Sequence, residues 1–365
     1  MLTNMLLLTA AMTMNIVDAK FTKSTELTNS YNFEQYLTES GKKYSCPKEY
    51  ATREGIFNTN MNIIKNHNSD SNPATYKLGV NMFTDRNKNE LKSSLGANKH
   101  ALRKTLKSTN DATTGGDQGH CGSCWAHAAV ETIESMLAIN TGVLTEISQQ
   151  ELVACMSNND ECGGTGGCEG ATAELAFDYM AEHGLPEVWT YGYEMNTYHF
   201  DVTNSNGACN RELTYAGLEA APRVVTGDGY VLLPRNSYDD LMHAIATIGP
   251  VSINVDASDW HAYEGGVFNG CAQDDVDINH VVQLVGYGTC PETHQDYWLV
   301  RNSWTPTWGV DGYIKIARED GYCGYDAHNM DGVGCNYNPT NVTVCGMCGI
   351  MYDSVYPTNT RLWEA

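Results

Sequence analysis

The sequence predicts an α+β fold in two lobes, preceded by a separate helical segment, and three observations support this. Apolar residues recur at helical spacing from Tyr31 to Asn68, and a polar segment with linker composition follows at residues 92–117. Helical periodicity continues to about His183, whereas beyond Pro250 the apolar period becomes two. Helices followed by strands are typical of an α+β body.

Each element has its own signal. In the first segment, a helical face carries the apolar residues Phe33, Tyr36, Leu37, Tyr50, Phe57, Met61 and Ile64, and a short strand is expected at 76–83. In the main body, a helix is expected from Ser123 to Asn140 with Gly142 just past its end, and a second helix from Thr172 to His183. Strands are expected around residues 251–255, 278–284 and 298–302.

The composition restricts the function. Twenty-two Lys and Arg against 44 Asp and Glu give a net charge of −22, which argues against nucleic-acid binding. The charge is uneven, because residues 20–107 carry a net +7 and residues 108–365 a net −28. A basic segment that docks on an acidic body is the favoured interpretation, and a basic disordered tail is the alternative.

The N-terminus has the features of a signal peptide. An apolar run from Met5 to Met14 is too short to span a bilayer, and small residues at Val17 and Ala19 suit a cleavage site. Residues 1–19 are therefore expected to be removed in the secretory pathway, with a lysosomal, vacuolar or extracellular destination and no membrane attachment. Thirteen cysteines fit an oxidising compartment, and their odd number leaves at least one unpaired.

Three residues suggest nucleophilic catalysis. Cys124 lies at the predicted start of a helix, where the helix dipole favours the thiolate. His280 lies on an apolar strand; most histidines in such places are satisfied core residues, but one facing a cleft would be a base. Asn302 on a neighbouring strand could orient the imidazole ring.

At these residues the chain resembles papain-like cysteine proteases of the cathepsin L type. Gln118-x5-Cys124-Trp125 is similar to the nucleophile motif of that family, and His280 and Asn302-Ser303-Trp304 to its other two catalytic segments. The N-terminal segment resembles the family's propeptide, with an ERFNIN pattern from Glu49 to Asn68 and a GNFD pattern from Gly79 to Asp85.

The resemblance implies a papain-like fold, a helical lobe and a β-barrel-like lobe with a cleft between them, preceded by an inhibitory propeptide. It implies a propeptide over 20–107 and a peptidase domain over 108–365, with an insertion at 319–346. The implied activity is that of a cysteine endopeptidase made as a zymogen. Because the +7 segment is attracted to the −28 body, and this attraction falls as acids protonate near pH ~4–5, acid is expected to activate the zymogen. Cys124, His280 and Asn302 would form the triad, and Gln118 would help to bind the oxyanion. No cofactor or metal is expected.

The resemblance also implies substrate contacts and disulfides. Substrate-binding positions would be Gly122, Gly170, Ala171, Asn279, Trp304 and Asp353. Asp353 would lie at the base of the S2 pocket and admit Arg or Lys there as well as Leu or Phe, unless it lies exposed on a shifted loop. The implied disulfides are Cys121–Cys168, Cys155–Cys209 and Cys271–Cys348. Two more bridges are expected among Cys162, Cys290, Cys323, Cys335 and Cys345, mostly within the insertion. Asn341 begins a glycosylation sequon.

The expected partners are protein and peptide substrates, the chain's own propeptide and cystatin-type inhibitors, with a monomeric enzyme and no nucleic acid. Two alternatives remain. One is an impaired homologue acting as a binding or storage protein, because the family's usual first mature strand is missing from residues 105–117. The other is an exopeptidase, which the short loop from Met156 to Gly167 does not favour, because it lacks the histidine pair of the cathepsin B type.

Overall fold

The computed structural model describes residues 20–28, 30–69, 74–95, 117–193, 209, 222–336 and 341–364. The predicted signal peptide and the predicted boundary at residue 107 lie outside these ranges. No helix within the described ranges has the length and apolar character needed to cross a membrane.

The N-terminal segment folds around two helices, α1 (Phe33–Ser40) and α2 (Pro47–His67). The helical pattern from 31 to 68 is thus interrupted, because Gly41 adopts a φ of 70° and ends α1. The Asn32 and Gln35 side chains form a capping box at the start of α1, and Pro47 occupies the first turn of α2. The apolar face predicted from the sequence packs into a small core containing Phe33, Tyr36, Phe57, Met61 and Ile64.

A short strand joins this segment to the main body. β1 (Tyr76–Leu78) pairs antiparallel with β6 (Tyr263–Phe268) and is shorter than the strand expected to Phe83. The chain leaves the sheet at Gly79, whose N–H donates to the Ala262 carbonyl at 2.8 Å. Glycine is needed here because a Cβ would lie 2.8 Å from the Glu264 side chain. The helix α3 (Lys88–Leu91) and a 3-10 turn (Lys92–Ser94) follow.

The helical lobe contains α4 (Cys124–Thr141), α5 (Gln149–Cys155) and α6 (Ala173–His183). Gly142, in the left-handed region at φ 76°, ends α4 as the sequence indicated. A three-stranded sheet flanks this lobe and is ordered β13 (Arg361–Leu362), β3 (Arg223–Thr226), β2 (Leu185–Pro186).

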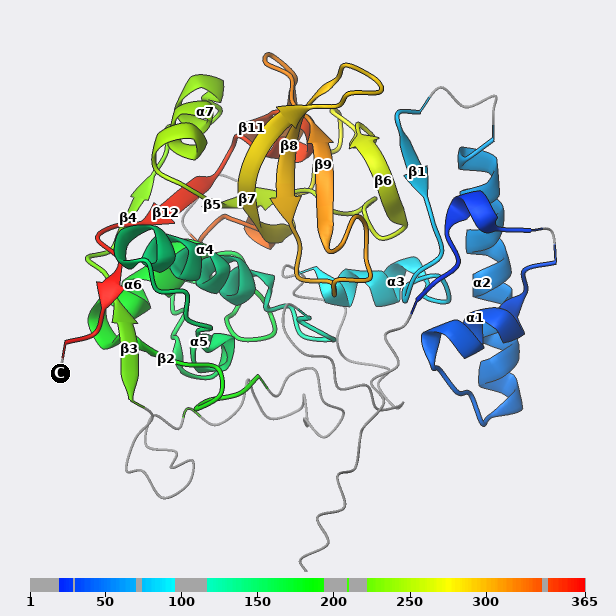
Figure 1. The fold of residues 1–365 in the computed structure, drawn as a ribbon, viewed down its shortest axis with the longest axis horizontal. Helices are drawn as coiled ribbons and strands as arrows, with labels where there is room; N and C mark the ends of the chain where they lie inside the picture. Colours follow the sequence, from blue (N-terminus) through cyan, green and yellow to red (C-terminus); the bar gives the residue numbers. More distant parts are fainter. Residues whose placement is uncertain are drawn as a thin grey trace, which may run out of the picture.

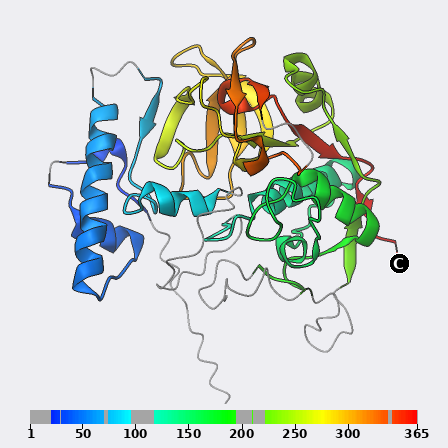
Figure 2. The same ribbon diagram turned by 180° about the vertical axis from the view of Figure 1, so that it is seen from behind.

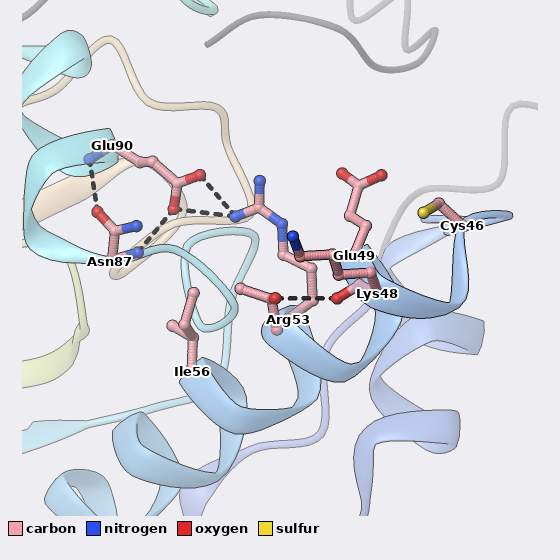
Figure 3. A pocket seen from close by; sticks show the side chains of 8 residues that line it. Cys46, Lys48, Glu49, Arg53, Ile56, Asn87 and Glu90 are labelled. Carbon is pink, nitrogen blue, oxygen red and sulfur yellow. Dashed lines mark hydrogen bonds and ion pairs between the residues drawn. The ribbon is translucent and has the colours of Figure 1, made fainter. Parts of the chain in front are cut away.

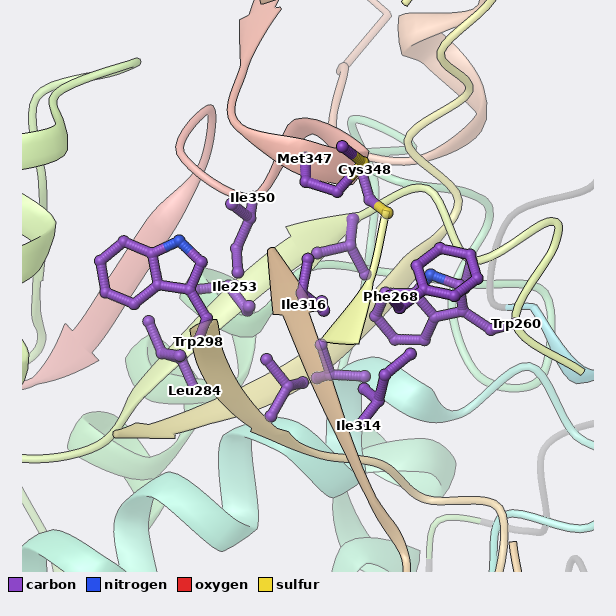
Figure 4. Close-up of a cluster of buried hydrophobic side chains, with 14 of the residues drawn as sticks. Ile253, Trp260, Phe268, Leu284, Trp298, Ile314, Ile316, Met347, Cys348 and Ile350 are labelled. Carbon is purple, nitrogen blue, oxygen red and sulfur yellow. The ribbon is translucent and has the colours of Figure 1, made fainter. Parts of the chain in front are cut away.

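The second lobe is an eight-stranded sheet ordered β1-β6-β9-β8-β7-β5-β12-β4. Its remaining strands and the helix α7 that accompanies them are β4 (Tyr230–Leu232), α7 (Tyr238–Thr247), β5 (Val251–Val255), β7 (His280–Thr289), β8 (Asp296–Arg301), β9 (Tyr313–Ala317) and β12 (Ser354–Pro357). Aromatic and branched side chains, among them Trp298, Ile316 and Phe268, fill its core (Figure 4).

The segment expected as an insertion, residues 319–346, forms a hairpin of β10 (Cys323–Asp326) and β11 (Val342–Cys345) with a 3-10 turn (Asn329–Asp331) between the strands. The Cys323–Cys345 disulfide joins the two strands. A second disulfide, Cys162–Cys335, ties this segment to the loop between α5 and α6.

Figures 1 and 2 show how these parts are arranged. The helices α1 and α2 lie to one side of the molecule, beside the edge of the sheet that β1 extends. In both views α3 lies beneath the strands, between α2 and the helical lobe. The N-terminal segment therefore leads directly to the junction of the two lobes.

Candidate active site

Cys124 is the first residue of α4 and is 1% exposed. Its Sγ lies 3.4 Å from the backbone N–H of Val281, which donates to the sulfur. A thiol in the first turn of a helix lies in the positive end of the helix dipole, and an N–H donor adds to that field. Both features favour the thiolate form.

His280 and Asn302 come together across β7 and the end of β8. His280 Nε2 lies 2.8 Å from Asn302 Oδ1, so the ring nitrogen donates to the amide oxygen. Because Nε2 is bound to Asn302, Nδ1 is the ring nitrogen left for proton transfer. It is buried with no hydrogen-bond partner among the described residues. The indole of Trp304 packs against the imidazole with ring centres 4.9 Å apart and shields it from water.

Gln118 is fully buried close to these groups. Its Oε1 accepts a hydrogen bond from Ser303 Oγ at 2.6 Å, which fixes the orientation of the amide. Its Nε2 donates to the Ser94 carbonyl at 2.9 Å and to the Cys121 carbonyl at 3.0 Å. The amide therefore presents its donor toward the segment that follows α3.

That segment covers the site. The Ser94 carbonyl accepts hydrogen bonds from Gln118 Nε2 and, at 3.2 Å, from Trp304 Nε1. Phe83 contacts the same indole edge-on at 5.4 Å. The N-terminal segment thus places a carbonyl on the side-chain donor of Gln118.

Residues of the motifs at 49–68 and 79–85 hold the N-terminal segment together. Asp85 is buried and accepts hydrogen bonds from Tyr36 at 2.9 Å, Lys42 at 2.5 Å and Tyr44 at 2.5 Å. Although burial opposes its charge, the Lys42 ammonium holds the pKa of Asp85 below its usual value. Asn60 Nδ2 donates to the Thr84 carbonyl at 2.8 Å.

Arg53 of the longer motif lies 2.8 Å from Glu90 on α3 (Figure 3). A surface pocket of about 290 Å³ lies beside this pair, between α2 and α3. The residues that line it belong to the N-terminal segment, so this pocket is separate from the site at Cys124.

Two histidines of the main body, His120 and His261, face the N-terminal segment, and no pattern in the sequence indicated either of them. Burial lowers the pKa of His120 to about 3, and the nearby cations Arg86, Lys42 and Arg53 add to the effect. His261 is buried, with Nε2 3.1 Å from Ser94 Oγ.

His127, on α4 three residues after Cys124, packs inside the helical lobe. Its Nδ1 lies 3.1 Å from the Ser123 carbonyl, and burial lowers its pKa to about 4. The ring is therefore neutral near pH 7, and its role is packing.

The positions expected to line the substrate cleft fall on adjoining loops. Gly122 pairs in parallel with Glu169, next to Gly170, which has a φ of 90° that favours glycine. Ala171 is buried. The Asn279 side chain binds the Ala257 N–H and the Ser258 hydroxyl, so it holds the loop after β5 in place.

Asp353 is buried rather than exposed. Asn254 Nδ2 donates to its carboxyl group at 3.0 Å, and a side-chain hydrogen bond links Asp353 to Glu174. Burial, followed by the charge of Glu174, raises the pKa of Asp353 well above its usual value. Glu174 Oε2 and Asn254 Oδ1 are buried oxygens without hydrogen-bond partners among the described residues. The sequence suggested Asp353 but not its two companions.

The structure pairs Cys121 with Cys168, Cys155 with Cys209 and Cys271 with Cys348. Of the five cysteines left open, Cys290 alone stays a thiol, with Sγ 3.0 Å from Glu292 Oε2. Asn341 is exposed at the start of β11.

Comparisons with known proteins show which family the chain belongs to. Residues 33–91 match the cathepsin propeptide inhibitor domain (I29), and residues 99–333 match the papain family cysteine protease domain. The chain is 32% identical over 320 residues to cathepsin L of Sarcophaga peregrina, with 79% of this chain and 88% of that protein covered. It is 34% identical over 315 residues to the KDEL-tailed cysteine endopeptidase CEP2 of Arabidopsis thaliana, with 77% and 80% covered.

Among solved structures, digestive procathepsin L 3 from the larval midgut of Tenebrio molitor superposes with a TM-score of 0.65 at 28% identity, covering 89% of this chain and 97% of that one. The recombinant stem bromelain precursor gives a TM-score of 0.66 at 30% identity, with 89% and 97% covered. The chain therefore belongs to the papain family of cysteine proteases and is a zymogen that carries the family's propeptide ahead of its protease domain.

Proposed function

We propose that the mature enzyme is an endopeptidase that uses Cys124, His280 and Asn302. The observation that carries this proposal is the buried arrangement of Cys124 at the start of α4 and the His280–Asn302 hydrogen bond of 2.8 Å. Labelling the acid-treated protein with an epoxysuccinyl thiol inhibitor, followed by peptide mapping, tests it. Modification of Cys124 supports the proposal, whereas an unmodified Cys124 favours the impaired homologue.

The reaction follows from this arrangement. The Cys124 thiolate attacks the scissile carbonyl carbon, and the new S–C bond leaves the negative charge on the carbonyl oxygen. Gln118 Nε2 and the Cys124 N–H donate to that oxygen. His280 then gives its proton to the leaving amine as the C–N bond breaks, and a thioester remains. Water loses a proton to His280, attacks the thioester and releases the Cys124 sulfur.

The propeptide suppresses this chemistry by occupying Gln118 Nε2 with the Ser94 carbonyl. Removal of the propeptide would free this donor for the oxyanion. Within the zymogen, burial lowers the pKa of His280 to about 4, which disfavours the imidazolium that a thiolate–imidazolium pair needs.

We further propose that acid releases the propeptide, in part through His120. Burial, followed by the charges of Arg86, Lys42 and Arg53, lowers the pKa of His120 to about 3, so the docked form binds a proton poorly. The undocked ring would titrate near its ordinary value of about 6.5. Docking is therefore strongest above pH ~6.5 and weakens as the pH falls toward 3, by up to about tenfold per pH unit. Propeptide ion pairs such as Lys42–Asp85 and Arg53–Glu90 lie within the propeptide itself and do not oppose this release.

This release is testable in the full chain with Cys124→Ser, which prevents self-cleavage. We expect propeptide cleavage by an added protease to accelerate as the pH falls from 7 to 4, and His120→Gln to flatten that dependence. His243→Gln, a change of an exposed histidine on α7, serves as the control. The same pH profile for His120→Gln and the parent would rule out a role for His120.

We propose that Asp353, Glu174 and Asn254 form a polar base of the S2 pocket that selects Arg or Lys at P2. Their buried acceptor oxygens suit a cation, which needs opposite charge when it is desolvated. Arg235 is the cation near Asp353, and it stacks on Tyr352 with 4.9 Å between its guanidinium carbon and the ring centre.

Because the pKa of Asp353 is raised, the Asp353–Glu174 pair holds a proton in acid and carries less negative charge there. The preference for Arg over Leu at P2 should therefore increase with pH. Asp353→Asn should lower the Arg/Leu ratio of kcat/KM at neutral pH by about tenfold or more. Dipeptide substrates that differ only at P2 measure it, with Asp274→Asn as an exposed control. An unchanged ratio would remove Asp353 from the S2 pocket.

The remaining proposals concern the setting of the enzyme. A signal peptide over residues 1–19 would direct it into the secretory pathway, toward a lysosome, vacuole or the exterior. Disulfides among the described residues fit such a compartment. We propose a monomer that is inhibited by cystatin-type proteins.

A further inference from the structure

His261 is a buried histidine outside the proposed triad that faces the ligand side of the site. It follows Trp260, just before β6, and is 6% exposed. Its backbone carbonyl accepts hydrogen bonds from Asn81 Nδ2 at 2.7 Å and Trp308 Nε1 at 3.2 Å. Its ring stacks on Trp304 with centres 4.6 Å apart and planes inclined by 14°. Because Trp308 and Trp304 belong to the protease domain, the ring is held there when the propeptide leaves.

The ring meets the covering chain through Ser94 and Leu91. His261 Nε2 lies 3.1 Å from Ser94 Oγ, while the carbonyl of the same serine accepts from Gln118 Nε2. One residue therefore bridges the oxyanion donor and His261. The carbonyls of Ser258 and Leu91 also face the ring, and the cationic groups near it are His280 and Arg86.

The position of His261 relative to the scissile bond follows from Trp304. This indole contacts both imidazoles, at 4.6 Å from His261 and 4.9 Å from His280. His280 must face the leaving amine in order to protonate it. The leaving residue, P1′, therefore lies next to His280 and the adjoining Trp304, whose indole His261 also contacts.

We propose that His261 is a specificity residue that favours a hydroxyl side chain, serine or threonine, at P1′. This inference rests on the proposed endopeptidase function. The hydroxyl would take the place of Ser94 Oγ on Nε2, and a hydroxyl can donate or accept as the ring requires. Alanine or valine at P1′ would leave a buried ring nitrogen without a partner, which costs more than the loss of a solvent-exposed hydrogen bond.

The experiment compares peptides that are identical except at P1′, as Ser/Ala and Thr/Val pairs, with the acid-activated full-length protein. We expect the Ser/Ala and Thr/Val ratios of kcat/KM to be about three to ten for the parent enzyme. His261→Leu should bring both ratios to about one, and His261→Gln, which keeps a polar group, should restore part of the preference. His243→Leu is the matched control, because His243 is exposed on α7.

Because each ratio compares two substrates of the same enzyme, differences in stability or in the concentration of active enzyme cancel. The epoxysuccinyl label on Cys124 measures the concentration of active enzyme independently. Ratios near one in the parent, or unchanged ratios in His261→Leu, would overturn the inference. The proposed function would still stand if Cys124 were labelled and the enzyme cleaved its substrates. A preference for Asp over Ser would also overturn it, because the ring would then act as a cation. Failure of the label and of all cleavage would instead refute the proposed function.

Discussion

Cys124→Ser should reduce kcat/KM by at least about 10⁴-fold while leaving the fold unchanged. A serine hydroxyl at the start of α4 has no low-pKa form comparable with the thiolate, so the attacking group is lost. Hydrolysis of a peptide substrate after acid activation measures the effect, and thermal unfolding of the zymogen checks the fold.

The chain offers a matched control in Cys290, a second buried thiol that forms no disulfide. Its Sγ contacts Glu292 Oε2 at 3.0 Å, a bond that a serine hydroxyl can also make. Cys290→Ser should therefore keep most of the activity. Equal loss in the two variants, or an active Cys124→Ser enzyme, would contradict the assignment of Cys124 as the nucleophile.

Gln118→Glu should lower kcat by about 10²–10³-fold, the usual effect of removing one oxyanion donor. The change keeps the oxygen that accepts from Ser303 Oγ but replaces Nε2, which now donates to Ser94 and Cys121. A carboxylate would repel the developing oxyanion.

The same variant should loosen the propeptide, because its oxygen would face the Ser94 carbonyl where a donor is needed. In the Cys124→Ser background, faster propeptide cleavage at pH 7 would show this. Both expected results depend on the same atom, Gln118 Nε2. If kcat fell while the propeptide was cleaved no faster, Nε2 would not bind both the substrate oxyanion and the Ser94 carbonyl.

The candidate catalytic residues could be named from the sequence because local patterns mark them. Cys124 follows a recognisable helix start, and His280 is out of place on an apolar strand. The helix bounds were also accessible, since Gly142 and Thr172 have clear end and start signals. The helix break at Gly41 was missed because the apolar face continues on both sides of it.

Contacts between distant segments were not accessible in this way. Nothing local to Ser94 indicates that its carbonyl meets Gln118, and nothing local to His261 indicates that it stacks on Trp304. Glu174 reads as an ordinary acid in the first turn of α6, yet it meets Asp353 179 residues further along the chain. Such pairs depend on how segments far apart in the chain pack together, which periodicity does not encode.

The disulfide between Cys162 and Cys335 has a practical consequence for handling the enzyme. It closes a loop of 173 residues between the α5–α6 loop and the hairpin segment, so a nick between these cysteines leaves both fragments covalently joined. The reductants used to keep Cys124 as a thiol attack the same kind of bond. The reductant that keeps Cys124 reduced can therefore also break the Cys162–Cys335 disulfide. The activity of the purified enzyme should accordingly pass through a maximum as the thiol concentration is raised.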